Sequence, residues 1–364
     1  MLLIIVQLFS CEDELTLDET MSLEEKIDVV IEPNTYFGKP GGIIIGIIQN
    51  GEKTIYSYGD AGLGYGAPKS NTIFEIASLT KTFTGILLNS MASDSILSME
   101  DTITKFLPEN VTPPTYNGEQ IKLWHLATHT SGLPNSCNNF NPDESVFTNE
   151  DYYDFLNNIS EQAFPFGNYT NGNELESLGT KAYYSNIGMA LLGHILELAS
   201  GEIYENLFDE RIANILSMPD TKTYEEQSSE QKDRIAKAYS TEQKEVEINK
   251  NWGRSVGAGA YLSTMDDMLN YIEANINASP SHFPAINQSH EMLFSANNGS
   301  ESGIGSAWFI NIVNSDTIIH HSGASVHESY IKFNKSKKYG IIALSNTRNY
   351  KFIDNINKIF ELLE

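Results

Sequence analysis

Hydrophobic positions alternate between two spacings along the chain, and they predict strands near both ends with helices between them. Residues 41–49 (GGIIIGIIQ) form a β-branched apolar run, Asn50-Gly51 is a hairpin turn signal, and residues 53–58 return as a second strand. Near the C-terminus, alternating or apolar segments predict strands at residues 308–313, 317–321, 330–334 and 339–345. A final helix is predicted from the apolar face formed by Phe352, Ile353, Ile356, Ile359, Phe360 and Leu363.

The middle of the chain has helical spacing. A helix is predicted after Ser78, where Leu79, Phe83, Ile86, Leu87 and Met91 recur at helical intervals. Residues 185–200 predict another, with Ser185 or Asn186 as its N-cap and Gly201 at its end. The expected fold class is therefore α/β, with an antiparallel sheet formed from both chain termini, flanking helices and a mostly helical inserted domain. We expect one composite unit and not two independent domains.

The N-terminal segment has a pattern of its own. Residues 2–9 are apolar but too few to span a bilayer, and Ser10-Cys11 and an acidic run follow them. The segment resembles a bacterial lipoprotein signal, in which Cys11 becomes the lipidated N-terminus; a misassigned start or an apolar strand is the alternative. We expect a signal peptide at 1–11, an acidic tether at 12–24, a globular domain at 25–364 and tethering at the bacterial cell envelope by the lipid alone.

Charge and cysteine content narrow the function classes. The 364 residues include 48 acidic and 23 basic side chains, a net charge of −25. Such a surface repels phosphate backbones, which argues against nucleic-acid binding. Two cysteines, Cys11 and Cys137, do not make a disulfide scaffold; a bond between them or a lone Cys137 thiol both stay open.

Ser78-Leu79-Thr80-Lys81 is an S-x-x-K element. A serine hydroxyl needs a neighbouring base to become a nucleophile, and residues three apart share one face of a helix. Lys81 Nζ can therefore reach Ser78 Oγ, while the helix N-terminus favours developing negative charge. Residues 229–232 and 329–332 also match, but only Ser78 begins a helix with an apolar face.

Two further elements complete a set. Tyr184-Ser185-Asn186 is a Y-x-N element at an expected strand-to-helix junction, where a phenol near an ammonium can be drawn towards tyrosinate and act as a base or proton relay. Without the rest of the set, a half-buried core tyrosine would be the simpler interpretation. His321-Ser322-Gly323 follows a predicted edge strand, where a cationic side chain can orient an anionic substrate group and the next backbone N–H can hold an oxyanion. Its simpler interpretation is a turn after a strand.

In this order and context, the elements resemble the class C β-lactamase, D-Ala-D-Ala carboxypeptidase and related esterase branch of the serine β-lactamase/penicillin-binding-protein-like superfamily. The resemblance runs over essentially the whole chain from about residue 25. It implies a site in the cleft between sheet and helices, without a metal or other cofactor. Further matching segments lie at residues 99–103 (MEDTI), 106–108 (FLP), 126–134 (LATHTSGLP), 184–193 (YSNIGMALLG), 263–267 (STMDD) and 303–305 (GIG).

The resemblance also implies roles for single residues. Ser78 is acylated, Lys81 and Tyr184 form the base system, and Asn186 contacts Lys81 and the substrate amide. Which of Lys81 and Tyr184 takes the proton is left open.

Besides Asn186, the substrate-binding residues implied by the resemblance lie at the end of the predicted strand 317–321 and directly after it. His321 stands where class C β-lactamases have the lysine of K-T-G, which disfavours efficient β-lactam hydrolysis. The N–H groups of Ser78 and Ala324 form the oxyanion hole, and Gly323 permits close backbone approach. His327 occupies a position where relatives often carry glycine, which leaves the shape of the cleft wall open.

His125 and His129 are four residues apart, a spacing that suits a metal on a helix. No glutamate follows His125, and the segment matches a structural stretch of the superfamily. We therefore expect a structural role for both and no metal site.

The expected function is a serine hydrolase that forms an acyl-enzyme with a peptide, ester or amide carbonyl, in which D-amino-acid peptides from peptidoglycan are a candidate substrate. A β-lactamase and a non-catalytic cell-wall binding or sensing protein are the alternatives. No nucleic-acid partner is expected, and the sequence leaves the oligomeric state open. If the His321 charge matters, cleavage of anionic substrates should fall as the pH rises through about 6–7.

Overall fold

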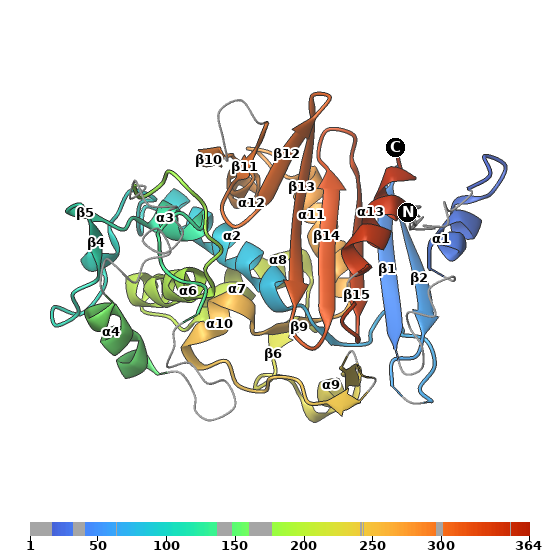
Figure 1. Cartoon of the computed structure of the whole chain (residues 1–364), viewed down its shortest axis with the longest axis horizontal. Helices are drawn as coiled ribbons and strands as arrows, with labels where there is room; N and C mark the ends of the chain where they lie inside the picture. Colours follow the sequence, from blue (N-terminus) through green and yellow to red (C-terminus); the bar gives the residue numbers. More distant parts are fainter. Residues whose placement is uncertain are drawn as a thin grey trace, which may run out of the picture.

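A computed structural model describes residues 17–31, 41–62, 64–136, 148–159, 177–240, 242, 244–295, 301–349 and 351–364. Within these residues the strands form an eight-stranded antiparallel sheet in the order β10-β11-β12-β13-β14-β15-β1-β2 (Figure 1). The first strand of the chain thus pairs with the last one, and both ends of the chain contribute to one sheet, as predicted. Their bounds are β1 (Gly42–Gln49), β2 (Glu52–Gly59), β10 (Phe294–Ser295), β11 (Ser302–Ile304), β12 (Phe309–Val313), β13 (Asp316–Ala324), β14 (Glu328–Asn334) and β15 (Tyr339–Ser345).

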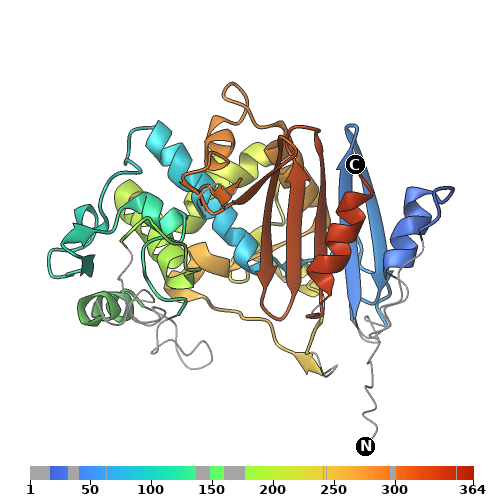
Figure 2. The same cartoon turned by 45° about the horizontal axis from the view of Figure 1, so that its top comes forward.

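Both faces of the sheet are covered, which explains the continuous apolar run of β1. Ile43, Ile45 and Ile47 point into a core shared with two helices, α1 (Leu23–Ile31) and α13 (Phe352–Glu361). The alternate residues Ile44 and Ile48 point into the larger core on the other face. A strand between two apolar layers reads as an unbroken hydrophobic segment and not as an alternating one. Figure 2 shows α1 and α13 on their side of the sheet.

The helical part lies between β2 and β10 in sequence and beside the sheet in space (Figure 1). Its central helix is α2 (Thr80–Ser93), which is buried over most of its length. The other helices and turns described are η2 (Ala77–Leu79), η3 (Ile103–Lys105), α3 (Leu123–Ala127), α4 (Asn149–Asn158), α6 (Asn186–Ser200), α7 (Tyr204–Phe208), η5 (Asp209–Ala213), α8 (Asn214–Leu216), α9 (Ser229–Asp233), η6 (Gly253–Ser255), α10 (Val256–Gly259), α11 (Met265–Asn277) and α12 (Pro284–Ser289). Short strands pair as β3-β9-β6, β4-β5 and β7-β8, with bounds β3 (Phe74–Glu75), β4 (Thr115–Tyr116), β5 (Glu119–Gln120), β6 (Lys222–Thr223), β7 (Ala238–Tyr239), β8 (Glu245–Val246) and β9 (Tyr261–Ser263).

The predicted ends of α6 are confirmed. Ser185 is the N-cap, and its hydroxyl accepts a hydrogen bond from the Gly188 N–H. Gly201 ends the helix in the left-handed conformation, at φ 78°. The sheet built from both ends of the chain and the helical insertion between them together confirm the predicted fold class.

Two local expectations differ from the structure. Helix α1 begins at Leu23, inside the segment expected to be a tether, because its apolar residues pack against the sheet. The residues before Tyr184 are not a strand but an irregular segment that leads into α6. The signal peptide with Cys11, residues 12–16 of the tether, and Cys137 lie outside the described residues. Among the described helices, none combines the length and the hydrophobicity that crossing a bilayer requires.

The close contact of α2 with the segment before β12 can be tested at Gly85. A Cβ at this position would lie 2.1 Å from the Ser306 carbonyl oxygen. In an exposed helix Gly→Ala stabilises by up to about 1 kcal/mol, but here overpacking against backbone reverses the sign. We expect Gly85→Ala to lower the free energy of unfolding by about 2–3 kcal/mol in urea denaturation.

Ser93→Ala on the exposed part of the same helix is the control, and its change should stay within about 0.5 kcal/mol. Equal stabilities for Gly85→Ala and the wild type would contradict the packing described here.

Candidate active site

Ser78 lies in the tight turn η2, immediately before α2, and its backbone is held by the sheet. Ala77 has a φ of +46°, a left-handed conformation that is unfavourable for a residue with a Cβ. The turn is fixed because the Ile76 carbonyl accepts hydrogen bonds from Leu79 N–H (3.1 Å) and from Ser329 Oγ on β14 (2.7 Å). The nucleophile candidate therefore begins the predicted helix on a constrained turn, partly exposed to solvent.

Lys81 has no exposed surface, and its ammonium group reaches back to Ser78. The Nζ atom donates to Ser78 Oγ at 2.9 Å and to the Ala258 carbonyl on α10 at 2.6 Å. Burial penalises the charged form and lowers the pKa of Lys81 from 10.5 to about 7. The S-x-x-K element thus places a half-deprotonated amine against a serine hydroxyl at neutral pH.

Tyr184 approaches the same pair from the start of α6. Its ring centroid lies 4.9 Å from Lys81 Nζ, and its hydroxyl is hydrogen-bonded to the Ser78 side chain. The expected shift towards tyrosinate is wrong for this structure. Burial raises the pKa of Tyr184 to about 12 and outweighs the hydrogen bond from Ser78, which lowers it. Tyr184 is a neutral phenol throughout the physiological range.

Asn186 lies next to this group but has a different partner from the one predicted. Its amide Nδ2 donates to Asn135 Oδ1 at 3.3 Å. In the described residues the hydrogen bonds of Lys81 go to Ser78 and Ala258, so the predicted contact between Asn186 and Lys81 is not formed. The physical reason is that the backbone N–H of Asn186 already binds the Asn135 carbonyl, which places the two side chains together.

His321 is close to the site but does not offer a positive charge to it. The side chain is buried, and its Nδ1 donates to the Ser322 carbonyl at 2.8 Å, which leaves Nε2 as a buried acceptor. Burial, with the nearby charge of Lys81, holds the pKa of His321 well below 6.5. The predicted cationic side chain is therefore wrong, and no loss of charge is expected between pH 6 and 7.

The strand that carries His321 is also not a simple edge strand. Up to His320 the strand β13 pairs with β12 on one side and β14 on the other, whereas residues 321–324 pair with β14 only. Its last residues are thus an open edge beside Ser78. A Cβ on Gly323 would lie 2.2 Å from the Ile76 oxygen and 3.0 Å from the Ser78 nitrogen. Glycine is needed for this approach, and it brings the N–H groups of Ser78 and of the exposed Ala324 to one region.

His327 does not shape the cleft wall. Its side chain is fully buried, and its Nδ1 accepts a hydrogen bond from the Glu75 N–H at 2.9 Å. Sequence reasoning missed Glu75, a buried carboxylate that accepts hydrogen bonds from Asn249 N–H and Ser325 Oγ. Burial raises the pKa of Glu75. Together these contacts anchor the segment before the nucleophile to the loop after β13; no local motif marks this long-range pairing.

The two histidines with metal-like spacing have backbone partners. His125 Nδ1 accepts from Lys122 N–H at 3.1 Å, and His129 Nδ1 accepts from Ser185 N–H at 3.2 Å. Over the described ranges, no group of three or more histidine, cysteine, aspartate or glutamate side chains is arranged to hold a metal ion.

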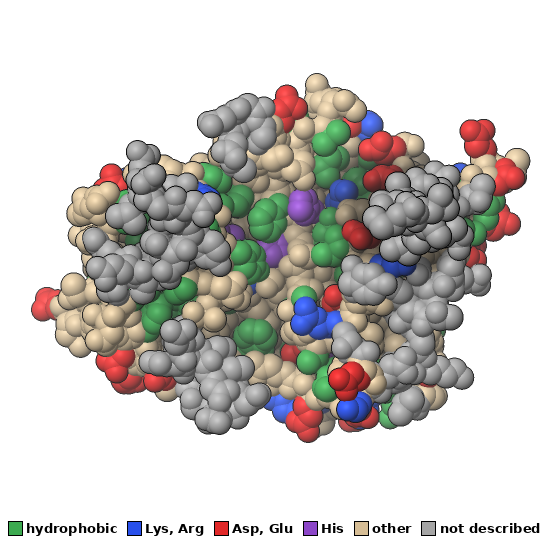
Figure 3. Space-filling model, viewed as in Figure 1, with side chains coloured by type: hydrophobic (Ala, Val, Ile, Leu, Met, Phe, Trp, Pro, Cys, Tyr) green, Lys and Arg blue, Asp and Glu red, His purple; other side chains and the backbone are tan. Residues whose placement is uncertain are grey.

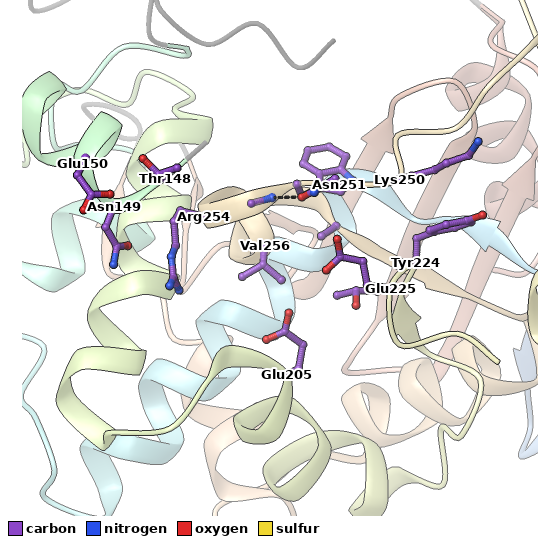
Figure 4. Close-up of a pocket in the computed structure, with 14 residues that line it drawn as sticks. Thr148, Asn149, Glu150, Glu205, Tyr224, Glu225, Lys250, Asn251, Arg254 and Val256 are labelled. Atoms are coloured by element: carbon purple, nitrogen blue, oxygen red, sulfur yellow. Dashed lines mark hydrogen bonds between the residues drawn. The ribbon is translucent and has the colours of Figure 1, made fainter. Parts of the chain in front are cut away.

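Figure 3 shows histidine and hydrophobic side chains in the hollow between the helical part and the sheet. Next to α10 a pocket of about 450 Å³ opens, drawn in Figure 4. Val256 and Ala260 line it from the same segment whose Ala258 carbonyl holds Lys81, and Trp252 adds an aromatic side chain. Polar and charged side chains also line the pocket, Glu205 and Arg254 among them.

Two bacterial proteins are similar to this chain over most of its length. The D-alanyl-D-alanine-carboxypeptidase/endopeptidase AmpH of Escherichia coli (strain K12) is 30% identical over 241 residues, which are 65% of this chain and 58% of AmpH. Protein flp of Staphylococcus aureus (strain MW2) is 26% identical over 351 residues, 93% of this chain and 66% of that protein. The chain thus matches less than two thirds of the length of these relatives.

Solved structures share the fold. A class C β-lactamase superposes with a TM-score of 0.78 at 22% identity, covering 94% of this chain and 96% of that one. A β-lactamase/D-alanine carboxypeptidase from Yersinia pestis, complexed with citrate, gives a TM-score of 0.75 at 22% identity, with coverages of 94% and 98%. The Beta-lactamase family model matches residues 37–363. The chain therefore belongs to the Beta-lactamase family, as its S-x-x-K, Y-x-N and H-x-G elements predicted.

Proposed function

We propose that this protein is a serine hydrolase that works through an acyl-enzyme on Ser78. One observation carries the proposal: Lys81 Nζ lies 2.9 Å from Ser78 Oγ in a fully buried position. A nucleophile and a base within hydrogen-bond reach are the signature of covalent catalysis by serine. Burial also brings the pKa of that base to about 7, which matches the working range of a general base.

The chemistry follows from the protonation states. Neutral Lys81 takes the Ser78 hydroxyl proton while Oγ attacks the substrate carbonyl, and the resulting oxyanion is held by the N–H groups of Ser78 and Ala324. Collapse of the intermediate breaks the bond to the leaving group, which receives a proton from the Tyr184 hydroxyl. The Lys81 ammonium replaces the proton of Tyr184. Water then hydrolyses the ester of Ser78, and the enzyme returns to its starting state.

This assignment gives Lys81 and Tyr184 different roles. A group with a pKa of about 7 is unprotonated often enough to accept a proton, whereas a phenol with a pKa of about 12 is protonated and donates. We assign the base to Lys81 and the proton transfer to the leaving group to Tyr184.

The proposed substrates are peptides, esters or amides with an accessible carbonyl, and D-amino-acid peptides are the first class to test. AmpH, a relative at 30% identity, is named a D-alanyl-D-alanine carboxypeptidase/endopeptidase. A β-lactamase stays the alternative, since solved structures with this fold carry that name. A purely binding role is not favoured, because it would not need a buried lysine beside a serine. We also keep the proposal of a lipid-tethered envelope protein, which depends on Cys11.

The acyl-enzyme can be detected by intact-protein mass spectrometry. With excess benzylpenicillin, the wild type should gain the mass of one ligand, because the opened β-lactam stays bonded to Ser78. Ser78→Ala and Lys81→Ala should each give no adduct and lose turnover, and the double variant should lose little more than either one. A persistent adduct indicates a peptidase, and rapid loss of the adduct indicates a β-lactamase.

A matched control is Ser229→Ala together with Lys232→Ala, which removes a second S-x-x-K match, on α9, that should not react. An adduct that survives in Ser78→Ala, or normal turnover in Lys81→Ala, would refute the assignment. If no adduct forms with benzylpenicillin, the same variants are compared with an activated ester as substrate.

The pH profile should show the buried lysine. Since neutral Lys81 is the active form, the acylation rate with an activated ester should rise about tenfold per pH unit below pH 7 and level off above it. No decline is expected between pH 6 and 9, because the pKa of His321 lies far lower and that of Tyr184 is about 12.

Glu328 lies opposite Ala324 on the neighbouring strand β14, and burial also raises its pKa to about 7. Because Glu328 could produce a similar pH profile, Glu328→Gln is the control. The rise should persist in this variant. A profile that becomes flat in Glu328→Gln would show that Glu328, and not Lys81, is responsible for it.

Burying Lys81 should cost stability. The unfolded lysine titrates near 10.4 and the folded one near 7, so between these values only the unfolded chain binds the proton and stability rises with pH. We expect Lys81→Met to be more stable than the wild type by roughly 1–4 kcal/mol at pH 7 and the difference to shrink towards pH 10. Urea denaturation at both pH values measures it.

Lys244→Met is the control, because the Lys244 side chain is 75% exposed. It should show no such change with pH. A Lys81→Met variant that is less stable than the wild type at pH 7 would mean that the two hydrogen bonds of Lys81 outweigh its burial.

A further inference from the structure

His129 contacts the segment that carries Tyr184 at three consecutive residues. Its carbonyl accepts a hydrogen bond from Tyr183 N–H at 2.8 Å, and its ring Nδ1 accepts one from Ser185 N–H at 3.2 Å. Between these two hydrogen bonds, the imidazole packs on the Tyr184 ring with 4.5 Å between centroids and 35° between planes. One residue thus binds the backbone directly before and directly after Tyr184 and also packs on the face of the Tyr184 ring.

The backbone of His129 is unusual in a way that fits this contact. Its φ is +59°, and left-handed residues other than glycine cost about 1–2 kcal/mol. The conformation lets the main-chain carbonyl and the ring of one residue reach N–H groups two positions apart. Such strain persists where the surrounding contacts over-determine it, and it concentrates at functional sites.

The state of the imidazole is also defined. Because Nδ1 accepts a hydrogen bond from a backbone N–H, the proton of the neutral ring is on Nε2. Nε2 is buried without a hydrogen-bond partner in the described residues. The charged or titratable groups that face the ring are Lys81, Tyr184 and His321, and burial together with the charge of Lys81 lowers the pKa of His129 to about 3. The ring is therefore a neutral support and does not exchange protons during turnover.

We propose that His129 is a positioning residue, which holds the Tyr184 hydroxyl against Ser78 so that it can protonate the leaving group. The inference rests on the proposed function of Tyr184. His129 acts through Tyr184, so its loss should slow the step in which the leaving group departs and leave substrate binding almost unchanged.

The test compares substrates that share an acyl group but differ in their leaving group. A nitrophenolate leaves without a proton, whereas an alkoxide or an amine needs one. In His129→Ala, kcat for the alkyl ester or amide should fall about 10- to 100-fold. Proton transfer by a positioned side chain contributes roughly 10²- to 10⁴-fold to the rate, and a misplaced Tyr184 should lose part of that contribution. For the nitrophenyl ester the fall should be less than about threefold, and KM should change less than about threefold for both.

A double-mutant cycle with Tyr184→Phe makes the test specific. Tyr184→Phe alone should show the same dependence on the leaving group, and adding His129→Ala to it should cost little more, because both remove one function. His129→Asn keeps a side-chain acceptor and tolerates a positive φ, so it should recover part of the lost activity. Because His129→Asn preserves these features, it also keeps the experiment valid if His129→Ala does not fold.

His125→Asn is the matched control. His125 is a buried histidine in the same segment, and its Nδ1 also accepts a backbone N–H, but it belongs to the cap of α3. This variant should lose stability without a change in leaving-group dependence. Equal losses on both substrates in His129→Ala and His129→Asn would overturn the proposal, since a merely structural role predicts them.

The two levels of the proposal fail differently. If Tyr184→Phe depends on the leaving group and the His129 variants do not, only the role of His129 is wrong. If Tyr184→Phe has no effect, the role of Tyr184 is wrong, and with it that of His129.

Discussion

The site depends on the complete burial of the Lys81 side chain beside a serine hydroxyl. In water this amine would carry a proton at neutral pH and could not take one from a serine. Its surroundings offer two oxygen acceptors, Ser78 Oγ and the Ala258 carbonyl, and in the described residues it forms no ion pair. A neighbouring carboxylate would stabilise the ammonium and raise the pKa again. Because no such partner is present among the described residues, the pKa of Lys81 stays low enough for it to act as a base. The cost of burying the amine must therefore be offset by energy from other parts of the fold.

That energy comes from close packing around α2. On one side, Gly85 lets the helix approach the Ser306 carbonyl. Asn89, one turn further along the helix, donates a hydrogen bond to the Ser306 hydroxyl. On the other side, Gly323 lets the end of β13 approach the turn that carries Ser78. The sheet that provides β13 is completed by β1 and β2 from the N-terminal part of the chain. Segments that are distant in sequence thus close on a single helix, and the hydrophobic core that they share offsets the cost of one buried amine.

Much of this could be predicted from the sequence, because the relevant signals are local. The isoleucines of β1, the Asn50-Gly51 turn and the caps of α6 each reflect a few neighbouring residues. The errors concern properties that depend on distant neighbours. His321 was expected to be a cation, and burial among Lys81 and His129 makes it neutral. Tyr184 was expected to move towards tyrosinate, but desolvation outweighs its hydrogen bond. The partner of Asn186 and the contact of His129 with residues 183–185 both require the fold to be known first.

The protonation states together give the proposed site a specific electrostatic character. Above pH 7 the lysine is largely neutral, the phenol of Tyr184 is protonated, and the imidazoles of His129 and His321 are uncharged. A substrate therefore meets a site whose catalytic groups carry little formal charge. When Ser78 attacks, the proton that moves to Lys81 creates an ammonium at the same moment as the oxyanion forms. Attraction between these charges exists in the transition state and not in the ground state, which is the condition under which binding energy increases the rate. Because water is excluded from Lys81, that attraction is only weakly screened.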